Sequence, residues 1–216
     1  MKMKKVGVFG LNLLMLCNSF ALTEVVDGIE WNYSVASGEA TIEHRIVNSR
    51  VTASIPSSTY GKIEIPSSLG GSPVAHIGSH AFYACGRITS VVVPDGVKSI
   101  DSSAFLQCSM SSIQLPDSLI VIHDHAFSYC DNLSQLVIPE NVVRIEELAL
   151  SDCGFKTLRI PASVQYLDEV AIHRCYKLER IEVDLKNQNY CTSDGALYDK
   201  TGKRLILCPN AKKEII

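Results

Sequence analysis

Five cysteines recur at a nearly fixed interval through the middle of the sequence. Successive cysteines are 23, 22, 23 and 22 residues apart, at Cys85, Cys108, Cys130, Cys153 and Cys175. Prolines keep the same interval, at Pro94, Pro116, Pro139 and Pro161. A self-similar period of this length is typical of a solenoid, in which each repeat forms one coil that stacks on the next. The period is too short for a pair of helices and long enough for one strand with a tight return.

Each repeat has the same pattern of apolar residues. The four clearest copies begin at Val93, Leu115, Ile138 and Ile160 and have the form apolar-Pro-x-x-apolar-x-x-apolar-x-x-x-Ala-apolar-x-x-Cys. Apolar and polar residues alternate before each proline, which predicts a strand with one buried face that ends at the proline. We expect the half of the repeat that ends at the cysteine to form a short extended piece followed by a helical turn. Stacked copies would build a parallel β-sheet.

This pattern resembles the BspA-type leucine-rich repeats of bacterial surface proteins. The resemblance covers about Gly28 to Pro209 and rests on the recurring Ile-x-x-x-Ala-Phe-x-x-Cys unit, in which Leu150 and Ile172 replace the aromatic residue. It implies an α/β, right-handed, horseshoe-like leucine-rich-repeat solenoid that is rich in β-structure, with a parallel sheet and few short helical turns. It also implies a secreted or surface protein that binds other proteins or host matrix and has no catalytic residues.

The N-terminus, residues 1–21, indicates a signal peptide. A positive start precedes an apolar run, Val6 to Leu16, that is too short to span a bilayer, and Ser19-Phe20-Ala21 has small residues where a signal peptidase cuts. An alternative is a lipoprotein anchored through Cys17, although lipoprotein signals prefer a small residue at the position of Leu16. Both alternatives predict an exported protein.

Three further segments follow the signal peptide. Residues 22–62 are expected to form an N-terminal capping hairpin region, residues 63–183 the leucine-rich-repeat solenoid, and residues 184–216 a C-terminal hairpin module. The final Ile215-Ile216 resembles the start of another strand, so the chain is either part of a longer array or pairs with another molecule through this edge. No later apolar stretch is long enough for a transmembrane helix.

Charge and motifs narrow the function classes. Without Lys2, Lys4 and Lys5, which lie in the signal peptide, 17 basic residues remain against 23 acidic ones, a net charge of −6. Nucleic-acid binding needs a basic face, so we predict no nucleic-acid partner. No nucleophile elbow, zinc-protease helix, phosphate loop or dinucleotide fingerprint is present in the sequence. We therefore predict no enzymatic activity and no cofactor.

Cysteines invite a metal-binding interpretation, which their spacing argues against. Metal-binding cysteines come in close pairs, whereas this sequence has one per repeat and no C-x-x-C pair. We predict a buried, inert file of thiols. Cys191 and Cys208 differ, because they flank the closing hairpin and are candidates for a disulfide in an oxidising compartment.

One ridge of acidic residues and a histidine is the weak metal candidate. Asp101, His123, Glu146 and Asp168 share a repeat position just after an inward Ile or Leu. Stacking would align them about 4.8 Å apart, where Ca²⁺ or a transition metal could bind. The alternative, which we favour, is a solvated acidic face without a metal.

Outward positions of the main sheet are the candidate ligand-binding surface. They form two rows with one residue of each row per coil: Val92, Gln114, Val137, Arg159 and Glu182 in one row, and Ser112, Gln135, Thr157 and Arg180 in the other. The alternative is a merely solvated sheet. A protein, extracellular-matrix or host-surface ligand would contact these rows, and oligomerisation would use the C-terminal edge.

Overall fold

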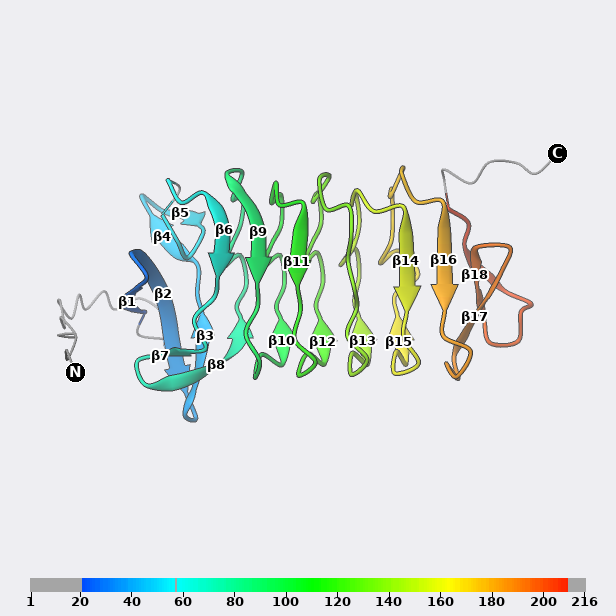
Figure 1. Cartoon of the computed structure of the whole chain (residues 1–216), viewed down its shortest axis with the longest axis horizontal. Coiled ribbons are helices and arrows are strands. Elements are labelled where there is room, and N and C mark those ends of the chain that lie inside the picture. Colours follow the sequence, from blue (N-terminus) through cyan, green and yellow to red (C-terminus); the bar gives the residue numbers. More distant parts are fainter. Residues whose placement is uncertain (1–20, 57, 210–216) are drawn as a thin grey trace.

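The computed structural model describes residues 21–56 and 58–209, so the predicted signal peptide, Cys17 and the Ile215-Ile216 pair lie outside the described residues, apart from Ala21. Within these ranges the chain forms 19 β-strands and no helix, and no membrane-spanning helix is present there. The coils stack along one axis, with the N-terminal strands at one end and the C-terminal hairpins at the other (Figure 1).

One row of parallel strands forms what we call the sheet face. Its strands are β6 (Gly61–Glu64), β9 (Ile88–Val92), β11 (Ser112–Gln114), β14 (Thr157–Ile160) and β16 (Arg180–Val183). β6, β9 and β11 pair in parallel, and so do β14 and β16. These are the alternating segments that precede each proline, and their buried positions point inward as the pattern predicts.

A second row of parallel strands lies across the core from the first and is visible in the lower half of Figure 1. Its strands are β8 (Ser72–Ile77), β10 (Ser99–Ile100), β12 (Val121–Ile122), β13 (Arg144–Ile145) and β15 (Tyr166–Leu167). They pair in order along the stack. Most are only two residues long, because the chain turns toward the cysteine directly after the inward Ile or Leu.

The segment between the second row and each cysteine is a run of β-turns, so the predicted α/β class with few short helical turns is not confirmed. The N–H groups of Ser103, Phe105 and Gln107 donate to carbonyls of the next coil, while those between them donate three residues back. Ser103 and Gln107 have φ values of 60° and 61°. An α-helix would need negative φ throughout and would use its amides internally. Every second N–H group of this segment donates to the next coil, so it is not available for the internal hydrogen bonds of an α-helix.

The axis of the stack shows no bend in the view of Figure 1, so the predicted horseshoe curvature is not seen there. Both rows consist of strands, which repeat at about 4.8 Å per coil. Curvature in a solenoid needs one side to be wider than the other, as when helices about 10 Å across line one side. Two rows of paired strands therefore favour a straight stack.

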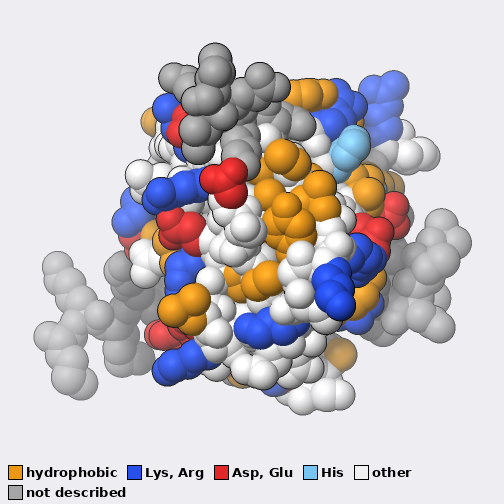
Figure 2. All heavy atoms as spheres, turned by 90° about the vertical axis from the view of Figure 1, so that its right-hand side faces the viewer, with side chains coloured by type: hydrophobic (Ala, Val, Ile, Leu, Met, Phe, Trp, Pro, Cys, Tyr) orange, Lys and Arg blue, Asp and Glu red, His pale blue; other side chains and the backbone are white. Residues whose placement is uncertain are grey.

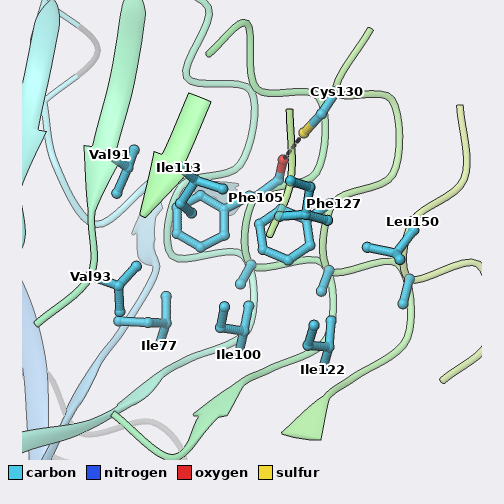
Figure 3. Close-up of a cluster of buried hydrophobic side chains, with 14 of the residues drawn as sticks. Ile77, Val91, Val93, Ile100, Phe105, Ile113, Ile122, Phe127, Cys130 and Leu150 are labelled. Atoms are coloured by element: carbon cyan, nitrogen blue, oxygen red, sulfur yellow. Dashed lines mark hydrogen bonds between the residues drawn. The ribbon is translucent and has the colours of Figure 1, made fainter. Parts of the chain in front are cut away.

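Aromatic side chains form a column through the first coils. The ring centroids of Phe82 and Phe105 are 4.8 Å apart, and those of Phe105 and Phe127 are 5.4 Å apart, with nearly parallel planes. Leu150 continues the column (Figure 3), and Trp31 covers Phe82 edge-on at 6.1 Å. All five side chains are almost fully buried, so their burial contributes to the stability of the stack.

Four of the five repeat cysteines form a buried column of thiols beside the aromatic one, as predicted, while Cys85 in the first coil is only half-buried. The thiols of Cys108, Cys130, Cys153 and Cys175 each donate to a backbone carbonyl of the preceding coil, at 2.9, 3.2, 3.2 and 3.1 Å. Figure 3 shows this bond from Cys130 to Phe105. Burial raises the pKa of Cys130 to about 12 and that of Cys175 to about 11. These thiols are therefore protonated and unreactive at neutral pH.

Antiparallel strands cover the N-terminal end. They are β1 (Leu22–Val26), β2 (Ile29–Ala36) and β3 (Glu39–Ile42), joined by the Asp27-Gly28 and Ser37-Gly38 turns. All four turn residues have positive φ, as two-residue hairpin turns require. β3 then pairs in parallel with β8, which connects this cap to the second row.

Two small hairpins complete the N-terminal half. β4 (Arg45–Val47) pairs with β5 (Arg50–Thr52), and β7 (Ser68–Leu69) pairs with β8 through Gly70-Gly71. The second hairpin accommodates the extra residues of the first repeat. Tyr33 lies against it so closely that a Cβ on Gly70 would be 2.7 Å from the tyrosine hydroxyl.

An antiparallel sheet of three strands closes the C-terminal end. It contains β17 (Tyr190–Ser193), β18 (Ala196–Asp199) and β19 (Leu205–Leu207). The hydroxyl of Tyr190 accepts the N–H of Leu167 at 2.8 Å, which satisfies a donor on the edge strand β15. Seen from this end, hydrophobic side chains gather near the middle of the surface (Figure 2).

Candidate functional site

The outward positions of the sheet face lie in register, as the repeat predicts. Val92 pairs with Gln114 and Arg159 with Glu182 in one row. In the other row an isolated bridge joins Ser112 to Gln135, and Thr157 pairs with Arg180. Eight of the nine predicted ligand-binding residues are exposed, and Val92 is half-buried. The structure therefore gathers all nine on one side of the molecule.

The sheet face is interrupted at its centre. Residues 131–139 form no strand, and only the bridge at Gln135 links this coil to β11. Val137, in the interrupted coil, is 77% exposed. The face therefore consists of two ladders that flank one exposed apolar side chain, where the sequence predicts a continuous sheet.

Charged side chains at the C-terminal end of this face neutralise one another. Arg159 donates to Glu140 and, at 2.7 Å, to Asp184, and Arg180 lies 2.6 Å from Glu182. The hydrogen bond to Glu140 raises the pKa of Arg159. The backbone N–H of Lys186 and the Arg159 guanidinium lower the pKa of Asp184. The charged end of the sheet face thus carries little unpaired charge.

The ridge of metal candidates is brought together only in part. His123 Nδ1 lies 2.9 Å from Glu146 Oε2, and His123 Nε2 lies 3.9 Å from Asp101 Oδ1. Asp168 is bound elsewhere, since it accepts the hydroxyl of Tyr166 at 3.0 Å. The ridge is a chain of pairwise contacts along the second row.

Neighbouring side chains already occupy the ridge carboxylates. Arg144 Nε donates to Glu146 at 2.7 Å, and the hydroxyl of Ser99 donates to Asp101 at 2.6 Å. Partial burial acts to raise the pKa of Glu146, but the hydrogen bonds from Arg144 and His123 outweigh it and hold that pKa below its ordinary value. In the described part of the chain no group of three or more ligating side chains has an arrangement that could hold a metal ion.

The two cysteines of the closing hairpin are free thiols in this structure. Cys191 is half-buried and donates to the carbonyl of Asp199 at 3.1 Å, while Cys208 is exposed. The predicted Cys191–Cys208 disulfide is not formed here and stays a prediction for an oxidising compartment.

A hollow lies at the corner of the stack that follows the thiols and was not predicted. It is lined by residues of three coils, among them Tyr129, Asp152, Gly154, Arg174 and Tyr176. The sequence does carry a signal for it, because the alternation of 22 and 23 residues comes from these corners. Repeat spacing alone gave no chemical reason to single them out.

Comparison with known families decides the identity of the fold. The BspA-type leucine-rich-repeat region matches residues 53–179 in six copies. The chain belongs to the BspA-type leucine-rich-repeat family. No curated protein matches this BspA-type protein in sequence.

Solved structures of bacterial leucine-rich-repeat proteins share the fold of this BspA-type chain. The Treponema pallidum leucine-rich-repeat protein is 26% identical with a TM-score of 0.62, over 70% of this chain and 67% of that one. A leucine-rich-repeat protein of Bacteroides ovatus is 26% identical with a TM-score of 0.60, over 75% of this chain and 41% of that one. The pneumococcal vaccine antigen PcpA is 20% identical with a TM-score of 0.65, over 89% of this chain and 57% of that one.

Proposed function

We propose that this chain is an exported, non-enzymatic binding module that holds a protein partner on its sheet face. The partner class that fits is a host-surface or extracellular-matrix protein. Export would follow from the N-terminal signal peptide, with release by cleavage after Ala21 or anchoring through Cys17 as the two routes.

The exposed, aligned rows of the sheet face carry this proposal. Their side chains project from successive coils at a spacing of about 4.8 Å, so the nine residues form one extended surface on a rigid stack. Because the stack is rigid, these residues lose less conformational entropy when a partner binds.

The chemistry of this face suits a protein partner. Protein interfaces have an apolar centre with few unpaired charges and a polar rim. Val137 is exposed near the centre of the face, Gln114 and Gln135 stand beside it, and the paired charges of Arg159 and Arg180 lie toward one end. This arrangement resembles an anchor residue surrounded by polar contacts.

Relatives support a location at the cell surface. A leucine-rich protein of Faecalibacterium prausnitzii, 21% identical with a TM-score of 0.52, is described as a cell surface protein, and PcpA as a vaccine antigen. The same location for this chain agrees with the predicted signal peptide.

Binding of the mature chain to a panel of immobilised matrix proteins tests the proposal. Val137→Glu places a charge at the centre of the sheet face and should weaken binding at least tenfold, about 1.4 kcal/mol or more. Ile46→Glu is the matched control, because Ile46 is 71% exposed on the β4–β5 hairpin, a separate two-stranded sheet that contains none of the nine residues. Full binding by Val137→Glu, or capture of no matrix protein by the unaltered chain, would remove the support for this function.

An assembly role is the second candidate, and the C-terminal end favours it. Leu205 in β19 is 51% exposed, and hydrophobic side chains gather on this end of the molecule (Figure 2). An exposed apolar edge strand can join another chain or a longer array. Sedimentation at increasing concentration, with Leu205→Lys as the variant, distinguishes this role, because only assembly through this end predicts association that the lysine abolishes.

A further inference from the structure

A hollow of about 350 Å³ opens at one corner of the stack, between the coil of Cys130 and the coil of Cys175. The middle coil has the shortest corner, because Cys153 and Phe155 are two positions apart. In the coils on both sides the corresponding residues are three positions apart, as in the step from Cys130 to Leu133. The missing residue of the middle coil leaves the space.

Gly154 belongs to the floor of the hollow. It is buried, while Asp131 and Tyr176, at the same repeat position in the flanking coils, are exposed. A Cβ on Gly154 would lie 2.2 Å from the carbonyl oxygen of Asp131, so only glycine lets the middle coil approach its neighbour this closely. The flanking coils then form two walls.

Each wall presents an exposed tyrosine. Tyr129 is 44% exposed and Tyr176 is 63% exposed, and they lie two coils apart, about 10 Å along the stack. Arg174 holds the second ring, with its Nε 3.2 Å from the Tyr176 hydroxyl and its guanidinium 6.0 Å from the ring centre. Such rings provide flat apolar contact area at a low entropic cost.

Polar groups of the hollow are balanced in charge. Asp131 and Asp152 are matched by Arg174 and Lys177, all of which line it. Arg174 Nε lies 3.1 Å from Asp152 Oδ1, and Lys177 Nζ donates across the gap to the carbonyl of Asp131 at 3.2 Å. An anion would meet two carboxylates, and a cation would meet a guanidinium and an ammonium. A neutral ligand with both donors and acceptors is therefore favoured.

We propose that this hollow is a binding site for a neutral saccharide, with one pyranose ring as the recognised unit. The C–H face of a pyranose is apolar and fits against a tyrosine ring. Its hydroxyls donate to carboxylates such as Asp152 and accept from Arg174 and Lys177. The volume lies at the small end of the range for ligand sites, which suits a single ring.

The test uses the mature chain and four neutral sugars: glucose, galactose, mannose and N-acetylglucosamine. Saturation-transfer NMR should detect binding of at least one of them, with a dissociation constant on the order of 1 mM. Tyr176→Ala should weaken that binding about tenfold, because one stacking face is lost. Tyr166→Ala is the matched control, since Tyr166 is also an exposed tyrosine beside an arginine but lies on the second row. It should bind the sugar as the unaltered chain does.

Asp152→Asn provides a second variant of nearly unchanged size. It leaves Arg174 without its carboxylate partner and makes the hollow net positive, so preference should move from the neutral sugar toward glucuronic acid. Three results would overturn the proposal: no neutral sugar binds at up to about 50 mM, both tyrosine variants lose binding equally, or the unaltered chain prefers a charged sugar or a peptide. None of the altered residues belongs to the sheet face, so the outcome is independent of the protein-binding proposal.

Discussion

The interior file of thiols and the corner that begins one residue later are adjacent in every repeat, yet they differ in almost every property. From Cys108 to Cys175 the file keeps one residue type, one hydrogen bond and near-complete burial. The corner position has a different residue in nearly every coil: Gly86, Ser109, Asp131, Gly154 and Tyr176. Its exposure also varies, from buried Gly154 to exposed Tyr176.

This contrast separates the residues that stack the coils from those that can carry chemistry. A thiol in the file contacts the coil before it, so any change there is felt by two coils at once. Apart from the buried Gly154, the corner residues are exposed to solvent and can change without disturbing the stack. Ligand chemistry in this protein is therefore expected where the repeat is least regular, at the recessed corner and at the interrupted centre of the sheet face.

Phe105→Ala should give the largest effect, because it removes a ring stacked between Phe82 and Phe127 in the interior. We expect a loss of about 3–5 kcal/mol in the free energy of unfolding, measured by urea denaturation. Tyr176→Ala, which alters an exposed residue at the corner, should change it by less than about 0.5 kcal/mol. Similar losses in the two variants would contradict the separation of interior and corner.

Gly154→Ala should cause the next largest loss of stability. It tests the one corner position that is buried. Its Cβ would lie 2.2 Å from a backbone oxygen, so the middle coil must move, at a cost of about 3 kcal/mol. Gly86→Ala, at the same repeat position in the first coil, meets nothing closer than 3.8 Å and should be neutral or slightly stabilising. Equal melting curves for the two alanine variants would show that the recessed corner is not held by this close approach.

Much of the fold can be predicted from the sequence because the same pattern of buried residues recurs in each repeat. The cysteine interval predicted the thiol file, and the alternation before each proline predicted the rows of the sheet face, including the register of Arg159 with Glu182. These features depend on side-chain periodicity, which the sequence displays directly.

Other features depend on backbone details that periodicity does not report. The turn segment uses Ser103 and Gln107 at positive φ, which residues of their type rarely adopt, and their backbone hydrogen bonds to the next coil favour it here. The break in the sheet face at Val137 and the hollow above Gly154 arise from small differences between neighbouring coils. A pattern that is common to all repeats does not contain such differences. The candidate sites lie where neighbouring coils differ in this way.

Cys130→Ala should give the smallest of the three effects, because it removes one sulfur and its hydrogen bond from a file that otherwise stays intact. We expect a loss of about 1–2 kcal/mol in the free energy of unfolding by urea denaturation, from the small cavity and the unpaired carbonyl of Phe105. Cys208→Ala, at an exposed thiol outside the file, should be neutral within about 0.5 kcal/mol. Cys130→Ser separates the two causes, since a hydroxyl restores the donor but is smaller and more polar than a thiol. If the serine variant is at least as stable as the original chain, the apolar character of the thiol is not what stabilises the file, and the hydrogen bond to Phe105 accounts for the contribution of Cys130.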